Sequence, residues 1–120
     1  MVRKEKNIMI VAQFSGPYTL EDIVIDLYVA VNQIGVYVLG NTILGTFVPK
    51  YVGRSDVNLN GRLKDWVGYY SQFKFGYYST QKDAYSTECW IYHQLFPSLD
   101  NERHPDKPIG KDYKCPWCGE

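Results

Sequence analysis

The chain has 120 residues, of which 45% are hydrophobic, and this is enough for one domain to bury a core without covalent staples. Its 13 basic and 13 acidic residues give a net charge of zero, so the net charge gives no reason to expect a polyanionic partner. Three cysteines fit a reducing compartment. Because no run of roughly 20 apolar residues is present, the sequence predicts a soluble cytoplasmic protein without membrane contacts.

The N-terminal residues 1–34 are expected to form a lead-in that packs on the domain. The apolar run Asn7–Phe14 is closed by Ser15-Gly16-Pro17 and predicts a strand or an extended lead-in. The segment Thr19–Val31 is ambiguous, because Thr19 and Asp22 resemble a helix start whereas its many β-branched residues favour a strand. Both interpretations stay open, and we expect this segment to pack beneath a sheet.

The middle of the chain predicts an antiparallel hairpin. Val36–Leu39 is a short apolar run, Gly40–Thr42 offers the turn, and Ile43–Val52 continues as the second strand. Pro49 lacks a backbone donor, so it belongs at an edge or at an irregular point of that strand.

A helix and a third strand are expected next. Asn58 is a candidate cap for the helix, whose inward stripe has four members: Leu59, Leu63, Trp66 and Val67. Aromatic residues then alternate with Lys74 and Gly76, as in a half-buried strand: Phe73, Phe75 and Tyr77.

The last regular element is a helix over Thr80–Phe96, opened by a Thr80/Asp83 capping pair and ended by Pro97. Its inward stripe consists of Ala84, Glu88, Ile91, Tyr92 and Leu95. A carboxylate among core-facing residues must be paired, protonated or bound to a metal. Glu88 therefore either reaches water or a buried arginine, with Arg62 as one option, or it binds a cation.

These elements predict an α+β fold with a small antiparallel three-stranded sheet flanked by helices. Between Lys50 and Lys82 there are six bases against two acids, Asp56 and Asp65. This excess is interpreted either as a local phosphate-binding surface or as an ordinary solvated face.

Two tripeptides in the hairpin resemble the motifs that name a nuclease superfamily. Gly35-Val36-Tyr37 and Tyr51-Val52-Gly53 are similar to the paired GIY and YIG sequences, with Val in place of each Ile. The similarity continues in order through Arg54, Arg62, Glu88 and Asn101, up to Pro105. The chain thus resembles a small stand-alone GIY-YIG domain protein, with the nuclease core at residues 35–105 and a tail at 106–120.

The resemblance implies a metal-dependent DNA endonuclease that hydrolyses phosphodiester bonds in DNA repair, recombination or restriction. Tyr37 and Tyr51 would orient or help to deprotonate the attacking water. Arg62 would stabilise the charge that develops on the scissile phosphate. Glu88 would bind one Mg²⁺ or Mn²⁺, a hard cation that prefers oxygen ligands.

Three further residues would contact the substrate or support the site. Gly53 would let the backbone approach the DNA, and Arg54 would touch a phosphate or assist the base. Asn101 would support the site through hydrogen bonds.

The identity of the general base is open. Many relatives carry His or Tyr four residues after the catalytic arginine, whereas this chain has Trp66, which cannot accept a proton. Tyr69, Tyr70 or His93 could replace it, or Tyr51 and the metal could suffice.

The tail carries Cys115-x-x-Cys118, which by spacing is half of a zinc site. The other soft candidates are His104, His93 and Cys89. One interpretation is a zinc site of Cys115, Cys118, His104 and a ligand from a partner chain or solvent, with thiols shared across a dimer as a variant. The other is an exposed tail with two free thiols.

The alternative function is a catalytically silent module of the same fold that binds nucleic acid or a protein. The expected partner is DNA, although RNA stays open. Because the chain has little room for a DNA-reading module, specificity would come from residues 1–34, from the Cys-containing tail, from oligomerisation or from a separate partner. A monomer and a homodimer both stay open.

Overall fold

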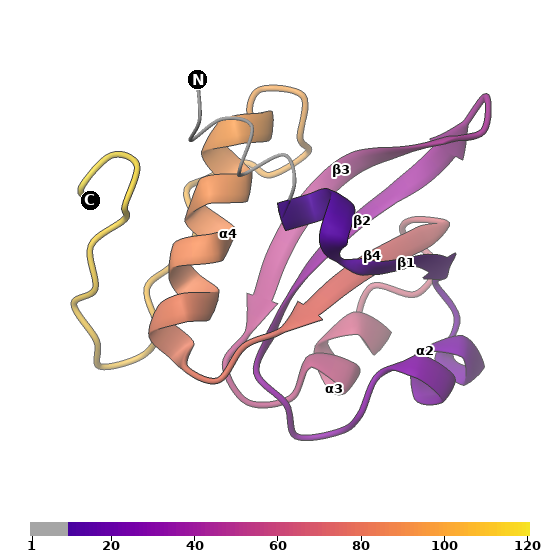
Figure 1. The fold of residues 1–120 in the computed structure, drawn as a ribbon, viewed down its shortest axis with the longest axis horizontal. Helices are drawn as coiled ribbons and strands as arrows, with labels where there is room; N and C mark the ends of the chain where they lie inside the picture. The colour runs from indigo at the N-terminus through magenta and orange to yellow at the C-terminus, as the bar shows by residue number, and fades with distance from the viewer. Residues whose placement is uncertain (1–9) are drawn as a thin grey trace.

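A four-stranded antiparallel sheet with the order β1-β4-β2-β3 runs through the protein (Figure 1). The computed structural model describes residues 10–120. The strands are β1 (Ser15–Thr19), β2 (Gly35–Ile43), β3 (Thr46–Ser55) and β4 (Gln72–Tyr77). The helices are α2 (Asp22–Tyr28), α3 (Leu59–Lys64) and α4 (Gln81–Leu95). The α+β class is confirmed.

The expectation of three strands was wrong, because β1 adds a fourth. β1 pairs with β4 alone and therefore forms an edge of the sheet, where Pro17 does not interrupt a central ladder. The register shifts between Ser15 and Tyr18, which accommodates the Gly-Pro pair. That pair looks like a strand breaker in the sequence, although here it lies inside an edge strand.

The strand expected at Asn7–Phe14 was also wrong where it can be seen. Residues 10–13 are helical, and residues 7–9 lie outside the described residues. The ambiguous segment that follows folds as helix α2 and packs against the sheet through Ile25, with Val29 just beyond the helix in the same cluster.

The hairpin of β2 and β3 is confirmed, but its turn lies later than expected. Ile43 pairs with Thr46, so Leu44 and Gly45 form a two-residue turn. Both have positive φ, 50° and 81°, as a type I′ turn requires. The Gly40–Thr42 segment, expected to form the turn, stays in the strand because its residues pair with those of β3. The register shift lies just before it, between Leu39 and Gly40. Pro49 faces Gly40 at this irregular point of an edge strand, as predicted.

Helices cover both faces of the sheet (Figure 1). On one face, α2 and α3 pack through Ile25, Leu59 and Leu63 on Leu39 and Phe73. α3 is shorter than predicted, ending at Lys64, and Asn58 stands at its N-cap without a side-chain capping bond. Trp66 and Val67 nevertheless pack on the same cluster from the turn beyond α3.

α4 covers the opposite face and agrees with its prediction. The Thr80 side chain accepts a hydrogen bond from the Asp83 amide at 3.0 Å, and the helix ends at Leu95, two residues before Pro97. Ala84 and Ile91 pack on Val36, Val38 and Val52. Beyond α4, residues 96–120 form neither helix nor strand. Of the helices in residues 10–120, none is long and apolar enough to cross a membrane.

Candidate active site

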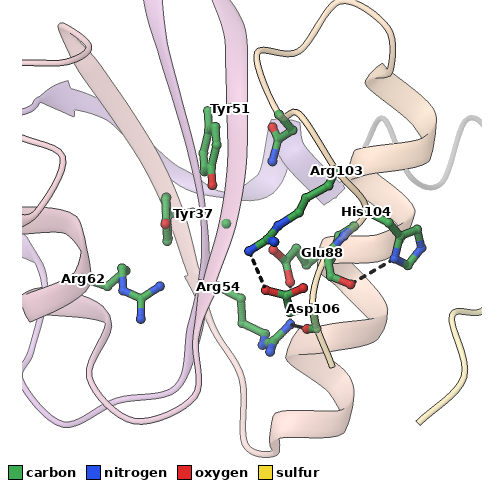
Figure 2. A pocket seen from close by; sticks show the side chains of 11 residues that line it. Tyr37, Tyr51, Arg54, Arg62, Glu88, Arg103, His104 and Asp106 are labelled. Carbon is green, nitrogen blue, oxygen red and sulfur yellow. Dashed lines mark hydrogen bonds and ion pairs between the residues drawn. The ribbon is translucent and has the colours of Figure 1, made fainter. Parts of the chain in front are cut away.

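A pocket of about 160 Å³ lies at the edge strand β3 and is lined by residues from both sides of that strand (Figure 2). β2, β3, α3, α4 and the segment after α4 all contribute to its lining: Tyr37, Tyr51, Gly53, Arg54, Arg62, Glu88, Asn101, Arg103, His104, Pro105 and Asp106. Every residue that the resemblance assigns to catalysis or substrate binding is among them, whereas the possible substitute bases Tyr69, Tyr70 and His93 are not. The structure therefore brings the assigned residues together, while their chemical roles stay predictions.

Tyr37 and Gly53 form one unit of the pocket. They are paired across β2 and β3, and the Tyr37 phenol fills the space where a side chain at position 53 would lie. The Trp66 indole donates a hydrogen bond to the Tyr37 hydroxyl at 2.8 Å. Burial raises the pKa of Tyr37 well above its usual value, so the phenol keeps its proton. Trp66 thus acts as a donor that holds Tyr37.

Replacing Gly53 with alanine should therefore displace Tyr37. The new methyl group would collide with the Tyr37 ring and hydroxyl, and such overpacking typically costs about 1–3 kcal/mol of unfolding free energy. Urea unfolding of Gly53→Ala would measure this cost. In a Tyr37→Ala background the same substitution should cost little, because the colliding atoms are gone; an equal cost in both backgrounds would contradict the assignment.

Tyr51 completes the aromatic wall of the pocket. Its ring centroid lies 6.5 Å from that of Tyr37 and 4.5 Å from that of Trp66. Burial and the nearby Glu88 carboxylate raise the pKa of Tyr51. Both phenols are therefore hydrogen-bond donors at neutral pH, suited to orienting a water rather than removing its proton unaided.

Glu88 lies at the base of the pocket in an ion pair with Arg54. Glu88 Oε1 accepts a hydrogen bond from Arg54 Nη1 at 2.6 Å, and the two side chains are only 9% and 8% exposed. Burial raises the pKa of Glu88 to about 7, against the opposing charge of Arg54. The arginine that meets Glu88 is thus Arg54, and the pairing with Arg62 considered above was wrong.

The Arg54 guanidinium is held on several sides. Asp56 accepts from its Nε at 2.7 Å and from its Nη2 at 3.0 Å, and the Asp106 carbonyl accepts from Nη1 at 2.8 Å. Four hydrogen bonds fix the guanidinium, which in turn fixes one Glu88 oxygen. These contacts show that Arg54 supports Glu88. A direct contact between Arg54 and a phosphate stays a prediction.

Arg62 is the more available cation. Its side chain is 51% exposed, and its ion pair with Asp65, at 3.9 Å, is weak because it is long and exposed. In Figure 2, Arg62 and Glu88 lie on opposite sides of β3, and Tyr37 lies on the same side as Arg62. A phosphate entering the pocket would meet Arg62 on one side and Glu88 on the other.

The segment after α4 forms the remaining wall, most of which sequence reasoning missed. The Asn101 side chain bonds both the N–H and the C=O of Val52, at 3.0 and 2.9 Å, and so covers the free edge of β3. This anchor places Arg103 and Asp106, 3.3 Å apart, at the mouth of the pocket (Figure 2). Their position within five residues after Asn101 was the available signal.

One oxygen of Glu88 is left for a ligand, and a hard divalent cation there stays a prediction. Mg²⁺ and Mn²⁺ bind through few carboxylates and keep several waters, and Arg54 occupies only Oε1 of Glu88. The negative charges of Asp56 and Asp106 raise the pKa of Glu88, and a bound cation would offset that repulsion.

The tail cysteines lie outside the pocket, in a cluster that shares His104 with the pocket lining. The ligand atoms of His93, His104, Cys115 and Cys118 all lie within 4.8 Å of one another and could hold a metal ion. His93 thus stands where a partner chain or solvent was expected to provide the fourth ligand, and it is not in the pocket as a base. The exposed-tail interpretation was wrong for Cys115, which is buried, and holds for Cys118, which is exposed.

No family model, no curated protein and no solved structure matches this chain. Any functional argument therefore depends on the residues themselves and on their geometry.

Proposed function

We propose that this protein is a metal-dependent DNA endonuclease of the GIY-YIG type. The observation that carries the proposal is one pocket lined by Tyr37, Tyr51, Arg62 and Glu88, four residues that the motif order singles out. The proposed substrate is a DNA phosphodiester, in repair, recombination or restriction.

Each of these residues has a distinct proposed task. Phosphodiester hydrolysis needs an activated water, neutralisation of the charge that develops on the phosphate, and help for the departing oxygen. A divalent ion held by Glu88 would supply Lewis-acid stabilisation. Tyr37 and Tyr51 would orient the attacking water through their hydroxyls, and Arg62 would neutralise the phosphate from the opposite side.

The alternative is a silent binding module that uses the same pocket. The buried Arg54–Glu88 ion pair favours it, because a carboxylate already satisfied by a guanidinium can be purely structural. A cleavage assay separates the two functions.

The decisive assay incubates the protein with supercoiled plasmid and labelled duplex, nicked and branched DNAs in Mg²⁺, in Mn²⁺ and in chelator. Nicking is expected only with the metals. Arg62→Ala should lower the rate about 10²–10³-fold, the usual effect of removing one transition-state donor, without loss of stability because the side chain is half exposed.

Lys64→Ala is the matched control. Lys64 lies two residues further along α3, pairs with Asp26 at 2.7 Å and does not line the pocket, so this variant should keep the wild-type rate. Equal residual nicking in wild type and Arg62→Ala would indicate contamination, and metal-independent DNA binding without nicking would establish the binding module.

A further inference from the structure

Two histidines and two cysteines form a second site behind the pocket wall. Zinc with nitrogen and sulfur ligands at about 2.0–2.3 Å would hold neighbouring ligand atoms roughly 3.3–3.8 Å apart in a tetrahedron. Cys118 Sγ and His104 Nε2 are already 3.5 Å apart, and all four ligand atoms lie within 4.8 Å of one another. We propose that His93, His104, Cys115 and Cys118 bind one zinc ion, which fastens the C-terminal segment to α4.

Both histidines are prepared for a metal. His104 Nδ1 lies 3.0 Å from the Pro105 carbonyl, which can only accept, so Nδ1 carries the proton and Nε2 presents its lone pair towards Cys118. Such a bond to the distal nitrogen is usual for metal-binding histidines. His93 Nε2 is buried without a hydrogen-bond partner among residues 10–120. A buried nitrogen left unpaired calls for a missing partner, and the proposed ion would be that partner.

The surroundings favour zinc over the hard cation proposed for Glu88. Two thiolates and two imidazoles are a common structural zinc set, whereas Mg²⁺ and Mn²⁺ prefer carboxylates and water. Trp117 stacks on His93 with centroids 5.6 Å apart and meets Trp90 edge-on at 5.0 Å. This aromatic cover limits the access of water to the site.

The C-terminal segment is also held in place without regular secondary structure. Residues 96–120 have no helix or strand to hold them in place, yet Cys115 is only 2% exposed. Metal binding supplies folding free energy to segments that cannot form a regular hydrogen-bond ladder.

The ion would also fix the wall of the pocket. His104 lies between Arg103 and Pro105, which line the pocket, and the Asp106 carbonyl bonds Arg54 at 2.8 Å. The other histidine, His93, is on α4, the helix that carries Glu88. A single ion would thereby clamp residues 103–106 onto the helix that provides the carboxylate.

Metal analysis of the full chain tests the site. Protein expressed with zinc and purified without chelators should hold one zinc per chain. Cys89→Ala should do the same; this control removes a thiol that packs near Cys115 but is not one of the four proposed ligands. Cys118→Ser should lose at least nine-tenths of the metal while keeping its far-ultraviolet dichroism, because Cys118 is exposed. A zinc-free wild type, or full retention of zinc by Cys118→Ser, would overturn the proposal.

Hydrogen exchange tests the clamp without DNA, so its result is independent of the nuclease assay. Removing zinc with a chelator should accelerate exchange in peptides covering residues 100–110 at least tenfold, and leave the β2–β3 hairpin unchanged. Unchanged exchange in residues 100–110 would show that no ion holds the wall.

Discussion

Glu88→Gln is expected to reduce metal-dependent cleavage by about 10³-fold or more while the protein stays folded. Loss of the buried Glu88 carboxylate removes the proposed metal ligand. Metal stabilisation of the transition state amounts to several kcal/mol, each 1.4 kcal/mol being tenfold. The glutamine oxygen can still accept the bond that Arg54 now gives to Oε1 at 2.6 Å. A folded, inactive variant is therefore the predicted result, measured by plasmid nicking and thermal unfolding.

Metal binding provides a readout that a merely structural glutamate would not affect. Because burial raises the pKa of Glu88 to about 7, the wild type should bind Mn²⁺ more tightly as the pH rises from 6 to 8, when the carboxylate loses its proton. Glu88→Gln should bind weakly at every pH. Glu102→Gln is the control, since Glu102 is exposed and does not line the pocket. Full activity of Glu88→Gln would refute the metal role.

The sequence was most informative where local signals agree. α4 was predicted because its cap, its stripe and its proline stop lie within one short segment. β1 was missed because an edge strand containing Gly and Pro exists only through its pairing with β4, more than 50 residues away. Such distant pairing overrides local propensity and cannot be deduced from the segment itself.

The candidate site, like the fold, could be predicted only in part from the order of residues along the chain. The residues that the motif order singles out line one pocket, yet the motif order did not identify the partner of Glu88. Side chains alternate between the faces of a strand, and Val52 packs on the α4 side, so Arg54 had to point towards Glu88 as well. This alternation could be read from the sequence once β3 was recognised. For the tail cysteines the spacing of Cys115 and Cys118 was a signal, and His93 was one candidate beside them. Their meeting in space was not predictable, because irregular segments carry no periodicity.

Arg54→Met should be the most destabilising of the charge-removing changes discussed here, by about 3–5 kcal/mol, the usual cost of breaking a buried ion pair on one side. The substitution leaves Glu88, and Asp56 with a 23% exposed side chain, without their cation. It also frees the Asp106 carbonyl, which now accepts from Arg54 at 2.8 Å. Urea unfolding would measure the loss.

The pH dependence of this loss separates a buried ion pair from simple packing. Arg54 lowers the pKa of Glu88 against burial, so its removal raises that pKa further above the value in the unfolded chain. A carboxyl group whose pKa is raised by folding contributes stability at low pH and loses it as the pH rises. Arg54→Met should therefore be more destabilised relative to wild type at pH 8 than at pH 6.

Two further variants test whether Arg54 holds the Glu88 carboxylate. Glu88→Gln should restore part of the stability of Arg54→Met, because the uncompensated charge is gone. Arg103→Met, which breaks an ion pair with side chains 82% and 74% exposed, should change stability by less than about 1 kcal/mol. If Arg54→Met were equally stable at both pH values and unaffected by Glu88→Gln, Arg54 would not be holding the carboxylate, and the geometry at the base of the pocket would need another support.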